Sequence, residues 1–154
     1  MPYPLISNAI LLAAVGAVFY TAWSDFKNFK IPNWSIALLT GLFIFYTLVA
    51  GRWGTIYSHV AIAVLIFAFG ILFYSKNLIG GGDVKLLSVV FLWSGTECSL
   101  PLAILIMIFS TVHVCIVKLT WIGERVTVGR TRIPLAPSVA AGLVGIFILS
   151  CPKH

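Results

Sequence analysis

Two aspartates are the residues of this sequence best suited to chemistry. The chain has only four acidic residues, and Asp25 and Asp83 are its only aspartates. Asp83 directly follows three consecutive glycines, Gly80, Gly81 and Gly82. Because glycine has no side chain and tolerates positive φ, a peptide substrate can lie close against such a backbone. The glycine cluster and the two carboxylates together indicate peptide hydrolysis.

Two carboxylates held a few ångströms apart do not both ionise cheaply, so they share a proton and titrate as a pair. One acts as a base on water while the protonated one polarises the scissile carbonyl. This chemistry uses neither a metal nor a cofactor, and we expect neither here. Lys85 lies two positions after Asp83. We expect it either to keep the other carboxylate ionised or to hold the substrate.

Each aspartate also has a purely structural interpretation. Asp83 would cap a helix that begins near Val84, and Asp25 would be a boundary carboxylate paired with Lys27 or Lys30. Two other functions stay open as alternatives. A small transporter or channel subunit would use the aspartates to handle protons or cations, and a catalytically inactive assembly scaffold would need no chemistry from them.

The composition is that of an integral membrane protein. Of the 154 residues, 60% are hydrophobic and only 9% are charged, which lies far from the usual soluble range. The formal net charge is +6, but no basic run with interleaved aromatic residues indicates nucleic-acid binding. In so apolar a chain, basic residues more often mark cytoplasmic loops. We therefore expect a lipid bilayer, and no nucleic acid, as a partner.

Apolar runs divide the chain into membrane spans. A helix needs about 20 apolar residues to cross the bilayer, and lipid requires that every backbone amide find an internal partner. We predict an all-α, polytopic membrane protein with six transmembrane helices, forming one membrane-embedded domain over residues 1–154. The expected spans are 5–23, 34–50, 57–74, 84–95, 100–121 and 134–151. The short fourth span is expected to tilt little or to extend past Gly95 towards Glu97.

Charge placement predicts the orientation of these spans. If 84–95 crosses, eight of the ten Lys and Arg residues fall in loops on one side, as the positive-inside tendency requires of the cytoplasm. Both termini are then extracytoplasmic. Because two crossings separate Asp25 from Asp83, both aspartates are expected at the cytoplasmic face. A position at one face favours a peptidase over a transporter, whose sites usually lie at the midplane.

Polar residues outside the aspartates suggest local structure. Pro32 breaks the chain, and Asn33 is expected to cap the second span. His113 is expected to hydrogen-bond a Ser or Thr of another helix, because one histidine without a second ligand makes no metal site. Residues 125–132 alternate around Gly129 and predict a small hairpin, whose edge would add a substrate strand.

Other residue types indicate packing and depth in the membrane. The five tryptophans lie near span ends, as an aromatic belt does. Four glycines are expected to permit close helix packing: Gly41, Gly70, Gly142 and Gly145. The three cysteines form no zinc motif, and the sequence favours no bridge between Cys98 and Cys151.

Three segments resemble one enzyme family. Residues 80–83 match the GxGD motif of intramembrane aspartyl proteases, and the continuation through Lys85 resembles the form found in type IV prepilin peptidases. Residues 24–33, with an aspartate ahead of a lysine and Ile-Pro-Asn, are similar to the first motif of that family. Residues 133–142 resemble the segment that opens its last span. The three motifs in this order cover nearly the whole chain.

The resemblance implies an aspartic endopeptidase of the cytoplasmic membrane that removes the short basic leader of prepilins or pseudopilins at the cytoplasmic face. It implies Asp25 and Asp83 as the catalytic dyad. Supporting or substrate-binding residues are expected in both motifs: Gly80, Gly81, Gly82, Lys85, Lys30, Pro32 and Asn33.

The sequence departs from the larger members of the family. Those members carry an insertion with paired cysteines and methylate the new N-terminus, whereas this chain contains no CxxC. We therefore expect no separate methyltransferase domain. The compact form resembles the peptidases of tight-adherence (Flp) pilus systems, and archaeal preflagellin peptidases are also related.

Overall fold

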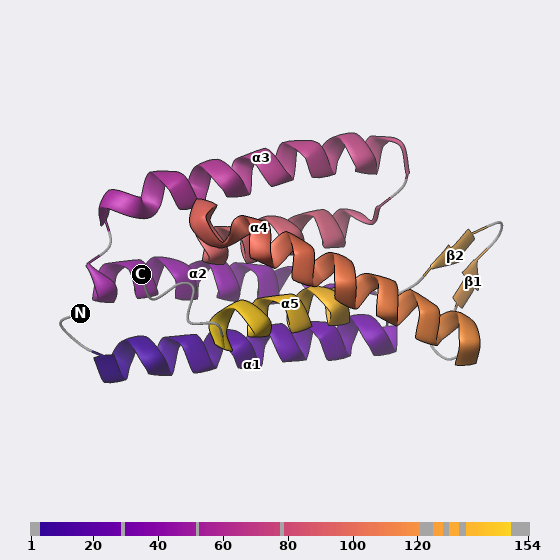
Figure 1. The fold of residues 1–154 in the computed structure, drawn as a ribbon, viewed down its shortest axis with the longest axis horizontal. Helices are drawn as coiled ribbons and strands as arrows, with labels where there is room; N and C mark the ends of the chain where they lie inside the picture. The colour runs from indigo at the N-terminus through magenta and orange to yellow at the C-terminus, as the bar shows by residue number, and fades with distance from the viewer. Residues whose placement is uncertain are drawn as a thin grey trace.

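The computed structural model describes residues 4–28, 30–51, 53–77, 79–120, 125–127, 130–132 and 135–148. Within these ranges the chain forms a bundle of helices with a small β-hairpin at one end (Figure 1). The elements are α1 (Pro4–Asn28), α2 (Asn33–Ala50), the 3-10 turn η1 (Trp53–Thr55), α3 (Ile56–Ser75), α4 (Gly81–Thr120), β1 (Arg125–Thr127), β2 (Arg130–Arg132) and α5 (Ala136–Ile148).

Four helical segments are long and apolar enough to cross a membrane: Leu5–Asn28, Asn33–Ala50, Trp53–Ser75 and Gly81–Ile116. The helix α5 is also apolar but shorter. The prediction of an all-α, multi-pass membrane protein is thus confirmed for the described residues, whereas the expected number of six spans is not reached by helix length.

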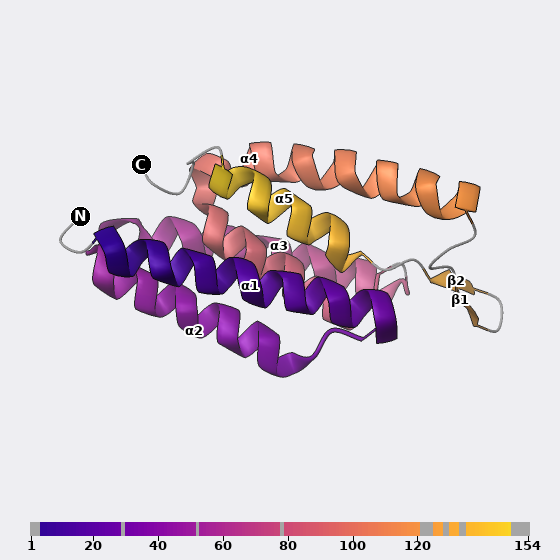
Figure 2. The same ribbon diagram turned by 90° about the horizontal axis from the view of Figure 1, so that it is seen from below.

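A break at Gly95 divides α4 into two arms. Gly95 has φ 64° and ψ −176° inside this 40-residue helix, a backbone that L side chains rarely adopt. The two arms run in opposite directions along the bundle (Figures 1 and 2). They correspond to the fourth and fifth predicted spans. The expectation that the fourth helix extends past Gly95 is wrong, because the left-handed glycine ends the first arm there.

The helix α3 contacts α4 at this break through His59. The Nδ1 atom of His59 lies 2.8 Å from the carbonyl oxygen of Leu92, whose partner in a continuous helix would lie beyond Gly95. A Cβ atom at Gly95 would lie 2.7 Å from the His59 ring. No pattern in the sequence predicted this contact.

Trp93 lies in the core and not in a membrane belt. It is 1% exposed, and its ring packs against Phe43, Tyr46 and Phe147 with centroid distances of 5.6, 5.7 and 5.8 Å. Its Nε1 donates to the carbonyl oxygen of Leu39 at 3.2 Å. The prediction of an interfacial anchor is wrong for Trp93, because an indole buried at this depth satisfies its N–H within the bundle.

Small residues allow close packing where α4 meets its neighbours. A Cβ atom added at Gly70 would lie 2.5 Å from Val84, one at Gly142 would lie 2.7 Å from Ile106, and one at Gly145 would lie 3.0 Å from Leu105. These three predictions are confirmed. A Cβ atom at Gly41 would have no neighbour within 4 Å, so the prediction that Gly41 permits close helix packing is wrong.

The predicted hairpin is present in the basic segment between α4 and α5. The strands β1 and β2 pair antiparallel, with Arg125 opposite Arg132 and Thr127 opposite Arg130. The hairpin lies at the end of the bundle where α1 ends and α4 begins (Figure 1).

Candidate active site

Asp25 lies in the last turn of α1, where it meets the start of α5. Its side chain is 5% exposed, and its Oδ2 accepts a hydrogen bond from the Ala136 amide at 3.0 Å. The first amides of a helix have no partner within the helix, so the carboxylate caps α5 from another part of the chain. Lys27 and Lys30 are exposed, and the hydrogen bond of the carboxylate is to this amide rather than to either lysine.

Asp83 is the third residue of α4 and lies in its first turn. The turn is closed by the Val84 amide, which donates to the carbonyl oxygen of Gly80 at 3.2 Å. The helix begins at Gly81, earlier than the predicted start near Val84. A Cβ atom at Gly80 would lie 2.8 Å from Oδ2 of Asp83. The absence of a side chain at Gly80 therefore leaves room for the carboxylate.

The two aspartate motifs contact each other. A Cβ atom at Gly82 would lie 3.2 Å from the Cβ of Ile31, and Nζ of Lys85 donates to Oδ1 of Asn33 at 3.1 Å. The first turn of α4 thus lies against the loop between α1 and α2. The expectation that Asn33 caps α2 is wrong: α2 has Pro32 at its N-cap position without a side-chain hydrogen bond, and the Asn33 amide group binds Lys85 instead.

Backbone contacts hold the loop of the first motif. Ser24 Oγ donates to the carbonyl oxygen of Lys30 at 3.2 Å. The Ser35 amide and its Oγ both donate to the carbonyl oxygen of Pro32, at 3.1 and 2.8 Å. Lys30 and Pro32 therefore contribute to the site through the backbone of the loop, and the Lys30 side chain is exposed.

A third segment completes the site on the side of α5. Nδ1 of His113, in the second arm of α4, lies 3.2 Å from Oγ of Ser138, which confirms the predicted helix–helix hydrogen bond. Asp25 and His113 also interact electrostatically. The sequence marked residues 133–142 as a motif, but it gave no sign that a backbone amide of this motif binds Asp25.

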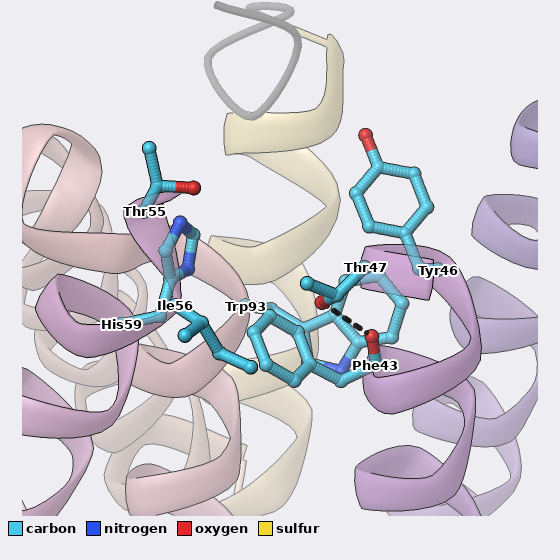
Figure 3. Close-up of a pocket in the computed structure, with 7 residues that line it drawn as sticks. All are labelled: Phe43, Tyr46, Thr47, Thr55, Ile56, His59 and Trp93. Carbon is cyan, nitrogen blue, oxygen red and sulfur yellow. Dashed lines mark hydrogen bonds between the residues drawn. The ribbon is translucent and has the colours of Figure 1, made fainter. Parts of the chain in front are cut away.

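A pocket elsewhere in the bundle has different chemistry (Figure 3). It is a small, partly open hollow, lined by Phe43, Tyr46, Thr47, Thr55, Ile56, His59 and Trp93. No acidic residue lines it, and Trp93 lies ten residues along α4 from Asp83, about 15 Å at helical rise. The hydroxyl of Thr47, which lines the pocket, donates to the carbonyl oxygen of Phe43. The aspartate end of the bundle is therefore the candidate active site.

Among the residues that the structure describes, no three His, Cys, Asp or Glu side chains gather as metal ligands. The chemistry available at the site is that of carboxylates, one lysine and backbone amides.

Comparison with protein families gives one match. The model of the type IV leader peptidase family matches residues 11–119, which is more than half of the chain. The matched region includes Asp25, Asp83 and both of their motifs, and it ends before the third motif. No curated protein and no solved structure matches the chain significantly.

Proposed function

Because the chain belongs to the type IV leader peptidase family, we propose that it is an intramembrane aspartyl endopeptidase that uses Asp25 and Asp83 as its dyad. Membership of the family makes it a protease of the prepilin peptidase type. The finer proposal is that it removes the short basic leader of prepilin-like or pseudopilin precursors at the cytoplasmic face of the inner membrane.

The observation that carries this proposal is the contact between the two aspartate motifs. They are separated by two helices in the sequence, yet Gly82 packs against Ile31 and Lys85 binds Asn33. Residues of the two motifs thus meet at one end of the bundle. A peptide bond presented at this end would meet groups from both motifs.

The start of α5 holds the Asp25 carboxylate in place for the proposed reaction, because Oδ2 accepts the Ala136 amide. In the proposed reaction one aspartate takes a proton from water, and the water oxygen attacks the scissile carbonyl carbon. The other aspartate gives its proton to the carbonyl oxygen. The C–N bond then breaks as the first aspartate gives the proton taken from water to the leaving amine. The carbonyl re-forms as one hydroxyl of the diol returns its proton to the second aspartate.

The proposed topology has six crossings, with the break in α4 outside the cytoplasm. Three observations support it: the two arms of α4 run in opposite directions, α5 ends towards the end of the bundle at which α1 begins, and Cys98, beside the break, is disulfide-bonded. The partner of Cys98 lies outside the described residues, as does Cys151. Disulfides persist in oxidising compartments and are rare in the cytosol, which supports the proposal that the break lies outside and the aspartates lie inside.

The test is co-expression of the chain with a small prepilin. The N-terminus of the prepilin is read by mass spectrometry for the wild type and for Asp25→Asn and Asp83→Asn. Loss of the leader only with the wild type supports the proposal. Cleavage by either variant at near wild-type rate refutes the dyad, and intact pilus assembly with both variants would favour a scaffold.

A further inference from the structure

We propose that His113 is a positioning residue for Asp25, acting through Ser138 and the first turn of α5. The inference rests on the proposed function, and it concerns a part of the chain that the family match covers only on one side, because the match ends at residue 119. Three contacts carry it: two join α5 to other helices, and one lies within the first turn of α5.

The first contact joins α5 to α1. Asp25 is buried, and the hydrogen bond of its Oδ2 is to the Ala136 amide at 3.0 Å. Ala136 is the first residue of α5. The orientation of the carboxylate therefore depends on the position of the start of α5.

The second contact is within the first turn of α5. The amides of Ser138 and Val139 both donate to the carbonyl oxygen of Leu135, at 3.1 and 3.2 Å. This turn is a closed unit, so a displacement of Ser138 moves Ala136 with it.

The third contact joins α5 to α4. Nδ1 of His113 lies 3.2 Å from Oγ of Ser138, which is 3% exposed. Further along the same pair of helices the contacts described above are apolar, as where Gly142 faces Ile106. Apolar packing gives little directional preference, whereas a hydrogen bond fixes the rotation of one helix against the other. His113 thus determines where the Ala136 amide points.

His113 acts on Asp25 indirectly. Its ring contacts Ser138, and the Ala136 amide of the same turn binds the carboxylate. The proximity of His113 to Asp25 is sufficient for an electrostatic interaction, but the hydrogen bond of its ring is to Ser138. A merely structural role would lower stability and leave turnover unchanged. A positioning role lowers kcat and leaves KM nearly constant.

The experiment measures kcat, KM and thermal unfolding with purified protein in vesicles and a small prepilin as substrate. The variants are His113→Leu, His113→Asn, Ser138→Ala and the double variant His113→Leu with Ser138→Ala. The matched control is Ser110→Ala, one turn earlier on the same arm, where a buried hydroxyl has no hydrogen-bond partner among the described residues.

We expect His113→Leu and Ser138→Ala each to lower kcat about tenfold to a hundredfold, with KM within about twofold, since small misplacements of reacting groups have effects of this size. The Asn side chain places a polar atom near the position of Nδ1, so His113→Asn regains most of the loss. The kcat of the double variant falls no further than that of either single variant, because the two substitutions remove the same interaction. Ser110→Ala cleaves like the wild type.

An unchanged kcat in His113→Leu overturns the inference, as does a loss in the double variant equal to the product of the single losses. If His113→Leu fails to insert, Ser138→Ala and His113→Asn decide: wild-type kcat in Ser138→Ala overturns the inference. If the wild type and the His113 variants cleave equally well, the inference is refuted and the proposed function stands. Wild-type protein that does not cleave refutes the proposed function, and the inference falls with it.

Discussion

The capping role of Asp25 is compatible with its proposed catalytic role. A carboxylate that is only 5% exposed is costly to bury unless it is hydrogen-bonded, and the Ala136 amide supplies such a bond. The same contact completes the N-terminus of α5, whose amides would otherwise lack partners. A capping function therefore does not argue against catalysis, because the cap also orients the carboxylate.

The three glycines before Asp83 differ in what surrounds them, and this gives a test at the residue scale. A Cβ atom at Gly80 would lie 2.8 Å from Oδ2 of Asp83, whereas one at Gly81 would make an ordinary 3.4 Å contact with Tyr74. We expect Gly80→Ala to insert and fold but to lower kcat at least tenfold, because the carboxylate must move. Gly81→Ala should cleave within about threefold of the wild type. Prepilin cleavage by both variants, in the same vesicles, is the measurement.

The difference between the two alanine variants is the informative quantity. Equal activity in Gly80→Ala and Gly81→Ala would contradict the placement of the Asp83 carboxylate beside Gly80. The position of Gly81 also agrees with the motif, in which the residue between the two glycines is the variable one.

At the scale of elements, the break in α4 sets where the second arm, which carries His113, lies against α5. Gly95 has φ 64° and faces the His59 ring, so a side chain there meets both backbone strain and a steric conflict. We expect Gly95→Ala to lower the free energy of unfolding by about 1–3 kcal/mol. Thermal unfolding in detergent measures this.

Gly41→Ala is the control for that prediction. Gly41 lies in a regular helix with open space around its Cα, and alanine there should leave stability unchanged or raise it by about 0.5–1 kcal/mol. If Gly95→Ala unfolded at the wild-type temperature, the left-handed break at residue 95 would be wrong.

Hydropathy predicts most of the elements but not how they join. Apolar length locates α1, α2 and α3, and the alternation around Gly129 predicts the hairpin. The α1 helix runs on to Asn28, past the apolar run, because hydrogen bonding continues after the hydrophobic residues end. The apolar runs 84–95 and 100–121 predict that the chain reverses between them, but no local pattern predicts that the reversal takes a single glycine packed against the His59 ring from α3.

The whole molecule has a predicted orientation that Cys98 can test. Cys115 is free and is replaced by serine to lower the background. A membrane-impermeant maleimide added to intact cells should label Cys98 only after reduction, because the proposed topology has its disulfide on the outer side. Peptide mass spectrometry assigns the label. Labelling of Cys98 only in permeabilised cells would reverse the proposed topology.

The sequence predicts the residues of the candidate site better than the contacts between them. Asp25, Asp83, Gly80, Gly82 and the segment after residue 133 are recognisable from motifs. The contacts that join them are not, because the Ala136 bond to Asp25 uses a backbone amide and carries no residue signature. The Lys85 bond to Asn33 joins residues that each had another expected role, and only their three-dimensional placement pairs them.

The central claim is that Asp25 and Asp83 act as one catalytic unit on a leader peptide. The most direct measurement is the rate of leader removal from a purified small prepilin in vesicles, read by mass spectrometry. Wild type is compared with Asp25→Asn, Asp83→Asn and the double variant. We predict that each single variant loses at least about a thousandfold in rate and that the double variant is no slower, as is usual for groups that act together. Cleavage at near wild-type rate by either single variant would contradict the account.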